Sequence, residues 1–491
     1  MTFSPISSRL TAHMSQLRSI ASNTIVQLIG RVVGTVFGVL TIAVLTRALG
    51  ADGYGQFTLA ITFLAIAGAL ADFGFTLTTT QMISEDGADE SKIISNAFTL
   101  RLVSGTTFFA LAILVSTFMP YDAIVKLTII IGAFSYFFMT ASQMLIGVYQ
   151  KHMAMWRPAM AEAVSRALIF AIILVLATTA PTVPNMMGAF VVGNLLLLMM
   201  NLGFSQKYAP VRLAWDKQVI YTYLSRSWPI ALSILFNLLY LKGDIIFLSF
   251  YRGNAEIGLY GAAYKVLDVV SVIPTMFMGL ILPLIVREWT ARSKDKVHEL
   301  LQQALDFFGL MAFPMLGGAL VLSTPIMTLI AGDEFAGSGP YLEILMIANT
   351  IVFFGVLFGH AIVGINKQKF ILPAYLLTAV VTTILYLIMI PKYGALGAAW
   401  TTVASEVLIA TMTTSTVIYF TKFRPKMRNT LVYLVSTALM TSFVWLGARK
   451  FELTPAVLVS LIAGGALVYA LAVLALGGVK RETIRLVMKR S

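Results

Sequence analysis

The sequence predicts an all-α membrane protein that crosses the bilayer about fourteen times. Of its 491 residues, 58% are hydrophobic and 12% are charged, whereas a soluble chain has roughly 45–50% apolar and about 25% charged residues. The apolar residues recur in long stretches along the whole chain, and a helix needs about 20 such residues to cross the hydrocarbon core. The alternating pattern of a transmembrane β-strand is missing, so each stretch is expected to be a helix.

Fourteen apolar stretches reach the required length. In chain order they are 20–46, 54–75, 96–118, 122–148, 158–179, 185–205, 228–250, 258–285, 304–330, 341–364, 370–390, 394–420, 428–447 and 455–477. The basic residues set their orientation, because lysine and arginine accumulate in cytoplasmic loops. With both termini on one side, that side holds 24 of the 35 basic residues, the other side holds six, and five lie inside spans. We therefore expect both termini in the cytoplasm.

Two of the predicted cytoplasmic loops have a distinctive composition. The loop 206–227 is basic and aromatic, which suits either an amphipathic helix on the inner leaflet or a plain linker. The acidic run 84–90 lacks the pattern of a calcium-binding loop. We expect its carboxylates to be solvated.

The chain also repeats itself. The stretch that follows the first predicted span matches the stretch that follows the seventh at an offset of 203 residues, pairing Gly50 with Gly253, Gly55 with Gly258, Phe57 with Tyr260 and Ala60 with Ala263. A second match pairs 147–151 with 364–368. Both matches fall six spans apart, so the repeats have the same orientation and are related by an axis along the membrane normal. This predicts a six-helix bundle with a basic connecting loop (1–227), a second six-helix bundle (228–420), and two additional spans with a basic tail (421–491).

Four short motifs resemble a known superfamily of transporters. They are Arg47–Gly55 (RxLGxxxYG), Leu70–Gly74 (xDFG), Asp244 followed by Gly258–Ala263 (D…G.YxxA), and Pro391–Ala399 (PxYGxxGAA). In this order they are similar to the polysaccharide-flippase branch of the multidrug/oligosaccharidyl-lipid/polysaccharide exporter superfamily. The resemblance covers nearly the whole chain, and two bundles of six spans with two extra spans is the layout of that superfamily.

The resemblance implies a flippase in a bacterial cytoplasmic (inner) membrane. Its substrate would be a polyprenyl-pyrophosphate-linked oligosaccharide, moved from the inner to the outer leaflet by alternating access for exopolysaccharide, capsule or O-antigen assembly. The implied partners are the lipid-linked substrate, membrane lipids, and a polysaccharide polymerase or export machinery. A cation-coupled drug exporter and a peptidoglycan-precursor flippase of the same fold remain alternatives.

Several other classes of function fit the sequence poorly. Cysteine is absent, which excludes thiol catalysis, thiolate metal sites and disulfides. No phosphate-binding GxxxxGK[ST] loop occurs, and the basic excess is explained by topology rather than by nucleic acid. A membrane enzyme that polymerises or ligates sugars needs a sizeable outer loop, which this sequence lacks. We expect neither enzymatic activity nor a cofactor or metal.

Charged residues inside the spans are the candidate site, because each is costly in hydrocarbon. The expected substrate-binding cations line a cavity between the halves and contact the pyrophosphate: they are Arg31, Arg101, Arg166, Lys242 and Lys265. Arg101 lies near a membrane edge, from which its side chain could also extend to water. The acids expected to couple an ion or to pair with these cations are Glu162, Asp244, Asp268 and Glu406. Glu162 with Arg166 and Lys265 with Asp268 have helical pairing distances, whereas Lys242 and Asp244 do not.

Overall fold

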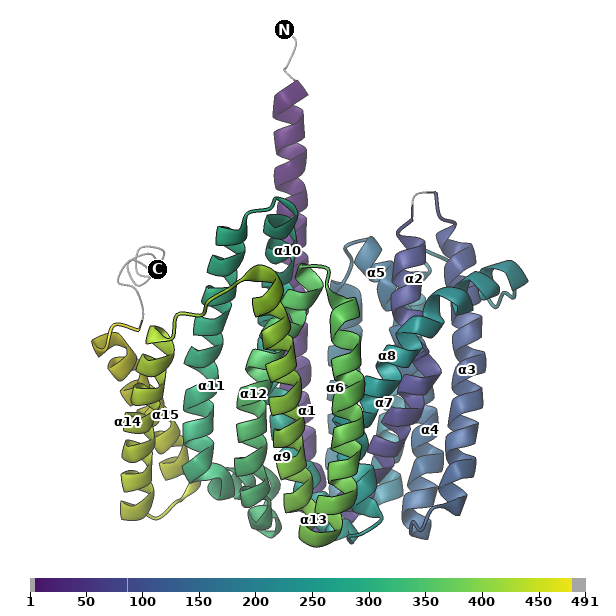
Figure 1. Cartoon of the computed structure of the whole chain (residues 1–491). Coiled ribbons are helices and arrows are strands. Elements are labelled where there is room, and N and C mark those ends of the chain that lie inside the picture. The colour runs from purple at the N-terminus through teal and green to yellow at the C-terminus, as the bar shows by residue number, and fades with distance from the viewer. Residues whose placement is uncertain (1–4, 86, 479–491) are drawn as a thin grey trace. The chain divides into compact units, whose positions relative to one another are not determined.

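In a computed structural model, every regular element of secondary structure among the described residues is a helix. The structure describes residues 5–85 and 87–478. It describes their side chains except those of 5–29, 31–32, 229–230 and 232–241. The helices of these residues are α1 (Pro5–Asp72), α2 (Phe75–Ile83), α3 (Glu90–Phe118), α4 (Ala123–Gln143), α5 (Ile146–Lys151), α6 (Trp156–Thr179), α7 (Val183–Ser205), α8 (Lys217–Ser249), α9 (Asn254–Val270), α10 (Val272–Thr290), α11 (Lys294–Ala331), the 3-10 helix η1 (Asp333–Ser338), α12 (Gly339–Gly364), α13 (Gln368–Thr421), α14 (Arg428–Lys450) and α15 (Pro455–Ala475). Figure 1 shows them as coiled ribbons.

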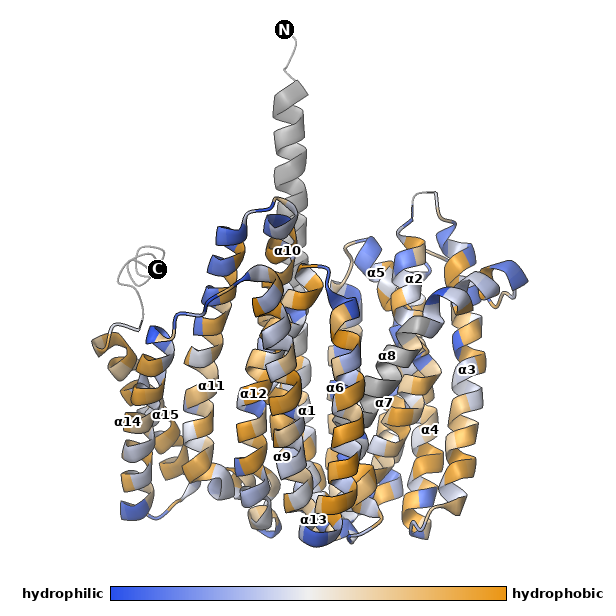
Figure 2. Ribbon diagram, in the orientation of Figure 1, coloured by the Kyte–Doolittle hydropathy of each residue, from blue (hydrophilic) through white to orange (hydrophobic). Residues whose placement is uncertain are grey.

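Eleven helical segments of the described chain are long and apolar enough to cross a membrane. One of them, 368–421, contains two of the predicted spans, and another, 33–83, contains the span 54–75 and the end of the span 20–46. The predicted span 228–250 lies on α8, whose side chains are only partly described. Hydrophobic residues cover the middle of the helices, and polar residues gather at their ends and in the connecting loops (Figure 2). The prediction of an all-α polytopic membrane protein is confirmed, while the count of fourteen stays a prediction.

Two glycines explain how paired spans appear as one long helix. Gly50 in α1 has φ 65° and Gly394 in α13 has φ 57°, a region that glycine enters without the steric cost of a Cβ. Each glycine marks the kink between two predicted spans and belongs to one of the four motifs. At Gly394 the turn is also crowded, since a Cβ there would lie 2.1 Å from Glu256 Oε1, the atom that accepts a hydrogen bond from Ala395 N at 2.7 Å.

The described chain divides into two compact units, Met1–Leu238 and Leu239–Ser491. In the first unit, Tyr149 and Leu145 are fully buried in a core with Ile94 and Ile83. In the second unit, Phe308 and Phe353 pack edge-to-face, with ring centroids 5.7 Å apart, in a large hydrophobic cluster. A smaller cluster around Tyr433 packs α14 and α15 against α11. The predicted division at 227 and 420 stays a prediction.

The first part of the loop before α8 is a linker bound along α3, which agrees with the linker alternative and not with the amphipathic helix. Residues 206–216 are not helical, and α8 begins at Lys217. Three backbone N–H groups donate to α3 side chains, joining Arg212 to Ser95, Ala214 to Thr99 and Asp216 to Asn96, at 3.1, 2.9 and 2.6 Å. Lys92 of α3 donates a hydrogen bond to the Asp216 carboxylate at 2.7 Å, which lowers the pKa of that carboxyl. Polar side chains of α3 thus satisfy backbone groups that a helix would have satisfied internally.

The acidic run 84–90 holds neighbouring elements together, so the expectation that its carboxylates are only solvated is wrong. Glu85 forms an ion pair with Arg226 of α8. Glu90 pairs with Lys151 at 2.7 Å and with His152 at 2.8 Å. Asp89 accepts from the backbone N–H of Lys92 at 3.0 Å and so caps α3.

Candidate functional site

The second unit contains a cluster in which two ammonium groups share one carboxylate. Lys242 of α8 lies 3.4 Å from Asp268 Oδ1, and Lys265 of α9 lies 3.5 Å from Asp268 Oδ2. The three side chains are 33%, 35% and 35% exposed, in the order Lys242, Lys265, Asp268. Lys242 Nζ also lies 4.6 Å from the centre of the Tyr264 ring, a cation–π distance. This Lys242–Lys265–Asp268 cluster therefore has one net positive charge and a partly open surface.

The local structure explains why these side chains meet. Lys265 and Asp268 are three residues apart in α9, which places them on one face of that helix. Lys242 reaches the same carboxylate from α8. Its near neighbour Asp244, two residues further on, projects elsewhere, as the helical period requires. The sequence predicted the local pair, but the approach of Lys242 depends on tertiary packing.

Asp244 lies in a buried, aromatic environment. It is 1% exposed, and its Oδ2 accepts a hydrogen bond from the Tyr260 hydroxyl at 2.8 Å. The Tyr260 ring in turn packs against Tyr264 and Tyr341, with centroids 5.8 and 6.1 Å away. No ion pair joins Asp244 to any residue whose side chain the structure describes. This carboxyl group is therefore withdrawn from water and held by a tyrosine hydroxyl.

The first unit has a second charged pair at membrane depth. Arg166 and Glu162 of α6 approach to 3.7 Å and are 42% and 51% exposed. Glu162 Oε1 lies 3.9 Å from the position that a Cβ would take at Gly34 of α1, so the pair borders that helix. This pair has no net charge. The side chain of Arg31, also in α1, lies outside the described residues.

Arg101 is fully buried, so the idea that it extends to water is wrong. Its side chain is 1% exposed, and its Nη1 lies 3.1 Å from Asp72 Oδ1. Its Nε donates to the carbonyl of Thr140 at 3.2 Å. Asp72 ends α1, and it is followed by Phe73 and Gly74, both with positive φ. Arg101 therefore neutralises the acid of the xDFG motif at the sharp turn between α1 and α2.

The remaining candidate, Glu406, is 6% exposed in α13. Across the described residues, no group of three or more His, Cys, Asp or Glu side chains could hold a metal ion. Among the acids named above, Asp72, Glu162 and Asp268 form ion pairs, and Asp244 and Glu406 are 1% and 6% exposed.

Comparison with known proteins identifies the family. The sequence model described as "Polysaccharide biosynthesis protein" matches residues 20–289, more than half of the chain. The chain belongs to this family. A putative O-antigen transporter from Shigella dysenteriae is 22% identical over 375 residues, covering 74% of this chain and 91% of the relative. A probable low-salt glycan biosynthesis flippase, Agl15, from Haloferax volcanii is 22% identical over 392 residues, covering 79% and 81%.

Solved structures show that this family member has the fold of the predicted superfamily. The lipid II flippase MurJ in an inward closed conformation superposes with a TM-score of 0.74 at 14% identity, covering 91% of this chain and 98% of MurJ. An inward-facing multidrug-resistance MATE transporter of the MOP superfamily gives a TM-score of 0.63 at 12% identity, covering 81% and 99%. The resemblance read from the four motifs is confirmed at the level of fold and family.

Proposed function

We propose that this protein flips a polyprenyl-pyrophosphate-linked oligosaccharide from the inner to the outer leaflet of a bacterial cytoplasmic membrane. The family description and the two relatives, named as an O-antigen transporter and a glycan biosynthesis flippase, support a glycan cargo. The basic loops support cytoplasmic termini. A polysaccharide polymerase or export machinery is the partner that would consume the flipped unit.

The observation that favours an anionic headgroup is the Lys242–Lys265–Asp268 cluster. A charged side chain at the centre of a membrane helix costs at least about 2.5–3.5 kcal/mol on insertion scales, and this cluster gathers two ammonium groups around one carboxylate. A pyrophosphate would complete the neutralisation while the polyprenyl chain stays in lipid. Lysine suits this role as a mobile point charge that can release the phosphate again.

Arg166 and Arg31 have a supporting role in this proposal. The Arg166–Glu162 pair is about half exposed, so a phosphate can compete with Glu162 for the guanidinium. Arg31 lies on α1, the helix that borders this pair at Gly34. Arg101, buried against Asp72, contributes to the structure of the first unit rather than to contact with the cargo.

Two other cargoes are possible for this fold. A drug exporter of the superfamily commonly moves cations, which a cluster of net positive charge would repel. A peptidoglycan precursor has the same pyrophosphate chemistry, and the fold of the lipid II flippase is similar. The names of the two sequence relatives favour the polysaccharide unit over the peptidoglycan one.

Deleting the gene should cause lipid-linked oligosaccharide to accumulate on the cytoplasmic face of the membrane. The lipid-linked sugar is labelled in inside-out and right-side-out vesicles from wild-type and deleted cells, and the amounts in the two leaflets are compared. Deleted cells with the gene restored on a plasmid are the control. Normal outer-leaflet oligosaccharide in the deleted cells would contradict the proposal. If the peptidoglycan precursor is the lipid that is lost from the outer leaflet of the deleted cells, the peptidoglycan precursor is the cargo.

Asp244 is the group we propose for ion coupling. Because its carboxyl is buried without an ion pair in the described structure, it can exchange a proton or a small cation when the transporter changes conformation. Asp244→Asn should reduce gradient-driven transport by about 5- to 150-fold, the usual range of a coupling free energy. Transport is followed in vesicles under an imposed proton or sodium gradient, with Tyr260→Phe as a control that keeps the carboxylate. Unchanged gradient dependence in Asp244→Asn would exclude this role.

A further inference from the structure

Two lysines at one end of the second unit lie over a cluster of aromatic rings. Lys367, directly before α13, has its Nζ 5.5 Å from the centre of the Phe370 ring and 4.8 Å from that of Phe420. Lys422, directly after α13, has its Nζ 4.8 Å from the centre of the Tyr419 ring. These five residues form the Lys367–Lys422 cluster.

The cluster forms because α13 folds back on itself at Gly394. The positive φ of this glycine divides α13 into two spans, so both ends of the helix lie on the same side of the second unit (Figure 1). Phe370 near the start and Phe420 near the end pack edge-to-face, with ring centroids 4.9 Å apart. The Tyr419 ring lies 5.1 Å from the Phe420 ring. One continuous aromatic surface therefore carries both ammonium groups.

The positive charge of the cluster is not neutralised within the described structure. Across the side chains that the structure describes, no acid lies within ion-pair distance of Lys367 or Lys422. The two segments that meet here, 367–370 and 419–428, contain six basic residues and no acid. An ammonium group over an aromatic ring keeps its charge and can still contact an anion.

The backbone at Lys422 has an uncommon conformation for lysine. This residue follows α13 with φ 60° and ψ 25°, the left-handed region in which glycine or asparagine usually ends a helix. A side chain with a Cβ enters this region at a steric cost. The Lys422 side chain is exposed, so burial does not offset that cost. A role for the ammonium group would account for a lysine here.

The aromatic rings indicate that the cluster lies at a membrane boundary. Phe370 and Tyr419 are 62% and 67% exposed. Each stands two residues from an end of 368–421, a helical segment long and apolar enough to cross a membrane. Aromatic rings are enriched where membrane helices reach the headgroups, and lysines extend from there to water and phosphate. A soluble acidic protein would account for the lysines but not for the exposed rings.

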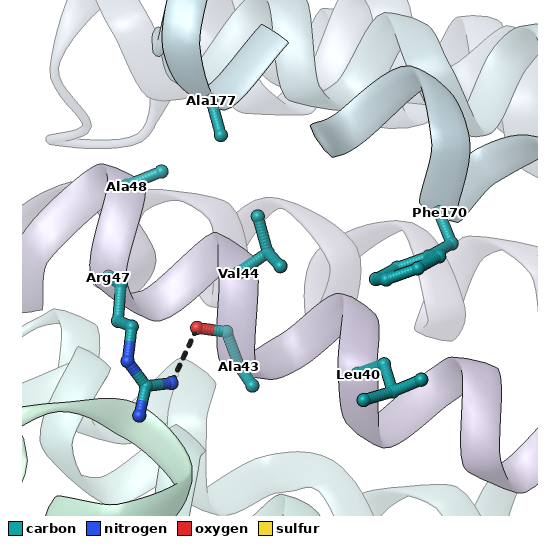
Figure 3. Close-up of a pocket in the computed structure, with 7 residues that line it drawn as sticks. All are labelled: Leu40, Ala43, Val44, Arg47, Ala48, Phe170 and Ala177. Atoms are coloured by element: carbon teal, nitrogen blue, oxygen red, sulfur yellow. Dashed lines mark hydrogen bonds between the residues drawn. The ribbon is translucent and has the colours of Figure 1, made fainter. Parts of the chain in front are cut away.

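A groove in the first unit lacks this combination. It lies between α1 and α6, has a volume of about 360 Å³, and is lined by Leu40, Ala43, Val44, Arg47, Ala48, Phe170 and Ala177 (Figure 3). Arg47 is the one cation among these lining residues, and its Nη1 donates to the Ala43 carbonyl at 2.9 Å. The cluster in the second unit differs because it presents two ammonium groups that no acid pairs with in the described structure.

We propose that the Lys367–Lys422 cluster binds the headgroup of an anionic phospholipid. The phosphate contacts the two ammonium groups, and the acyl chains lie along the exposed rings of Phe370 and Tyr419. The lysines belong to loops that the sequence predicts to be cytoplasmic, and anionic lipids of the cytoplasmic leaflet attract basic segments. Such a lipid would bind whichever cargo the protein carries.

The test titrates delipidated protein with phosphatidylglycerol and counts bound lipid by native mass spectrometry. Lys367→Gln and Lys422→Asn should each weaken binding at one site by about fivefold, the attraction of one basic residue to an anionic surface, and the double variant by about 25-fold. Asparagine tolerates the left-handed backbone at position 422. Phosphatidylcholine should bind more weakly than phosphatidylglycerol and equally to the wild type and the double variant.

Two lysines at the opposite end of the spans provide the matched control. Lys450 ends α14 with its Nζ 5.9 Å from the centre of the Phe451 ring, and Lys392 is exposed beside the turn at Gly394. The Lys392→Gln, Lys450→Gln double variant removes the same amount of charge. It should bind phosphatidylglycerol as tightly as the wild type.

Three results would overturn the proposal. The first is unchanged phosphatidylglycerol binding in the Lys367→Gln, Lys422→Asn variant, and the second is an equal loss in the control variant. The third is tighter binding of polyglutamate than of phosphatidylglycerol, lost in the same double variant, which would make an acidic protein the partner. Thermal unfolding checks that each variant is folded, and if the double variant is not, the two single variants decide the question.

Discussion

Arg101→Met is expected to destabilise the protein by about 3–5 kcal/mol, the usual cost of removing one partner of a buried ion pair. The substitution leaves the Asp72 carboxylate without the guanidinium that lies 3.1 Å away. It also removes the donor to the Thr140 carbonyl, which connects α3 to α4. The loss is measured as a shift in the unfolding transition of the purified protein in detergent, followed by tryptophan fluorescence.

A matched arginine and a second substitution separate this effect from a general loss of packing. Arg166→Met also removes an arginine inside a span of the first unit, but its pair is about half exposed and should contribute at most about 1 kcal/mol. Asp72→Asn in the Arg101→Met background should restore part of the loss, since no carboxylate is then left uncompensated. Equal destabilisation by Arg101→Met and Arg166→Met would show that the buried pair with Asp72 has no special importance.

Replacing Lys242 and Lys265 together with glutamine is expected to abolish transport while the protein still folds. The double variant changes the net charge of the cluster from one positive to one negative, leaving Asp268 to repel the pyrophosphate. Each single variant leaves a neutral pair and should raise the KM for the cargo by about 10- to 100-fold, as expected for one lost contact between charged groups. The measurement is initial transport rate against cargo concentration in vesicles.

Two control variants of the same unit make this result specific. Lys392→Gln removes an exposed lysine in α13, beside the turn at Gly394, and should leave KM unchanged. Asp268→Asn raises the charge of the cluster and should retain binding of the anion, with slower release. A double variant that transports normally would exclude this cluster from the cargo site.

The fold was largely predictable because the membrane imposes a simple rule on sequence. Stretches such as 158–179 and 185–205 correspond closely to α6 and α7, since a helix that crosses lipid must be apolar along its whole length. Gly50 and Gly394, which belong to two of the four motifs, lie at kinks in α1 and α13. The connecting segments were less predictable: the conformation of 206–216 depends on hydrogen bonds to α3, which no local pattern shows.

The candidate site was predictable only where its contacts are local. Arg166 with Glu162 and Lys265 with Asp268 are one helical turn apart, and both pairs are found. Arg101 pairs with Asp72 from a different helix, and Glu85 with Arg226 across 141 positions of sequence. Such pairs depend on how helices pack, so spacing along the chain could not reveal them. The xDFG motif could have pointed to Asp72, because an acid at a turn inside the membrane needs a cationic partner.

The most direct test of the central claim places the purified protein in vesicles that contain a lipid-linked, pyrophosphate-bearing oligosaccharide in one leaflet. A membrane-impermeant sugar-modifying enzyme then reports the oligosaccharide that reaches the other leaflet. We predict translocation by the wild type, loss of translocation in the Lys242→Gln, Lys265→Gln double variant, and no translocation of a cationic drug. Transport of the drug, or equal translocation with and without the two lysines, would contradict an anionic cargo recognised by this cluster.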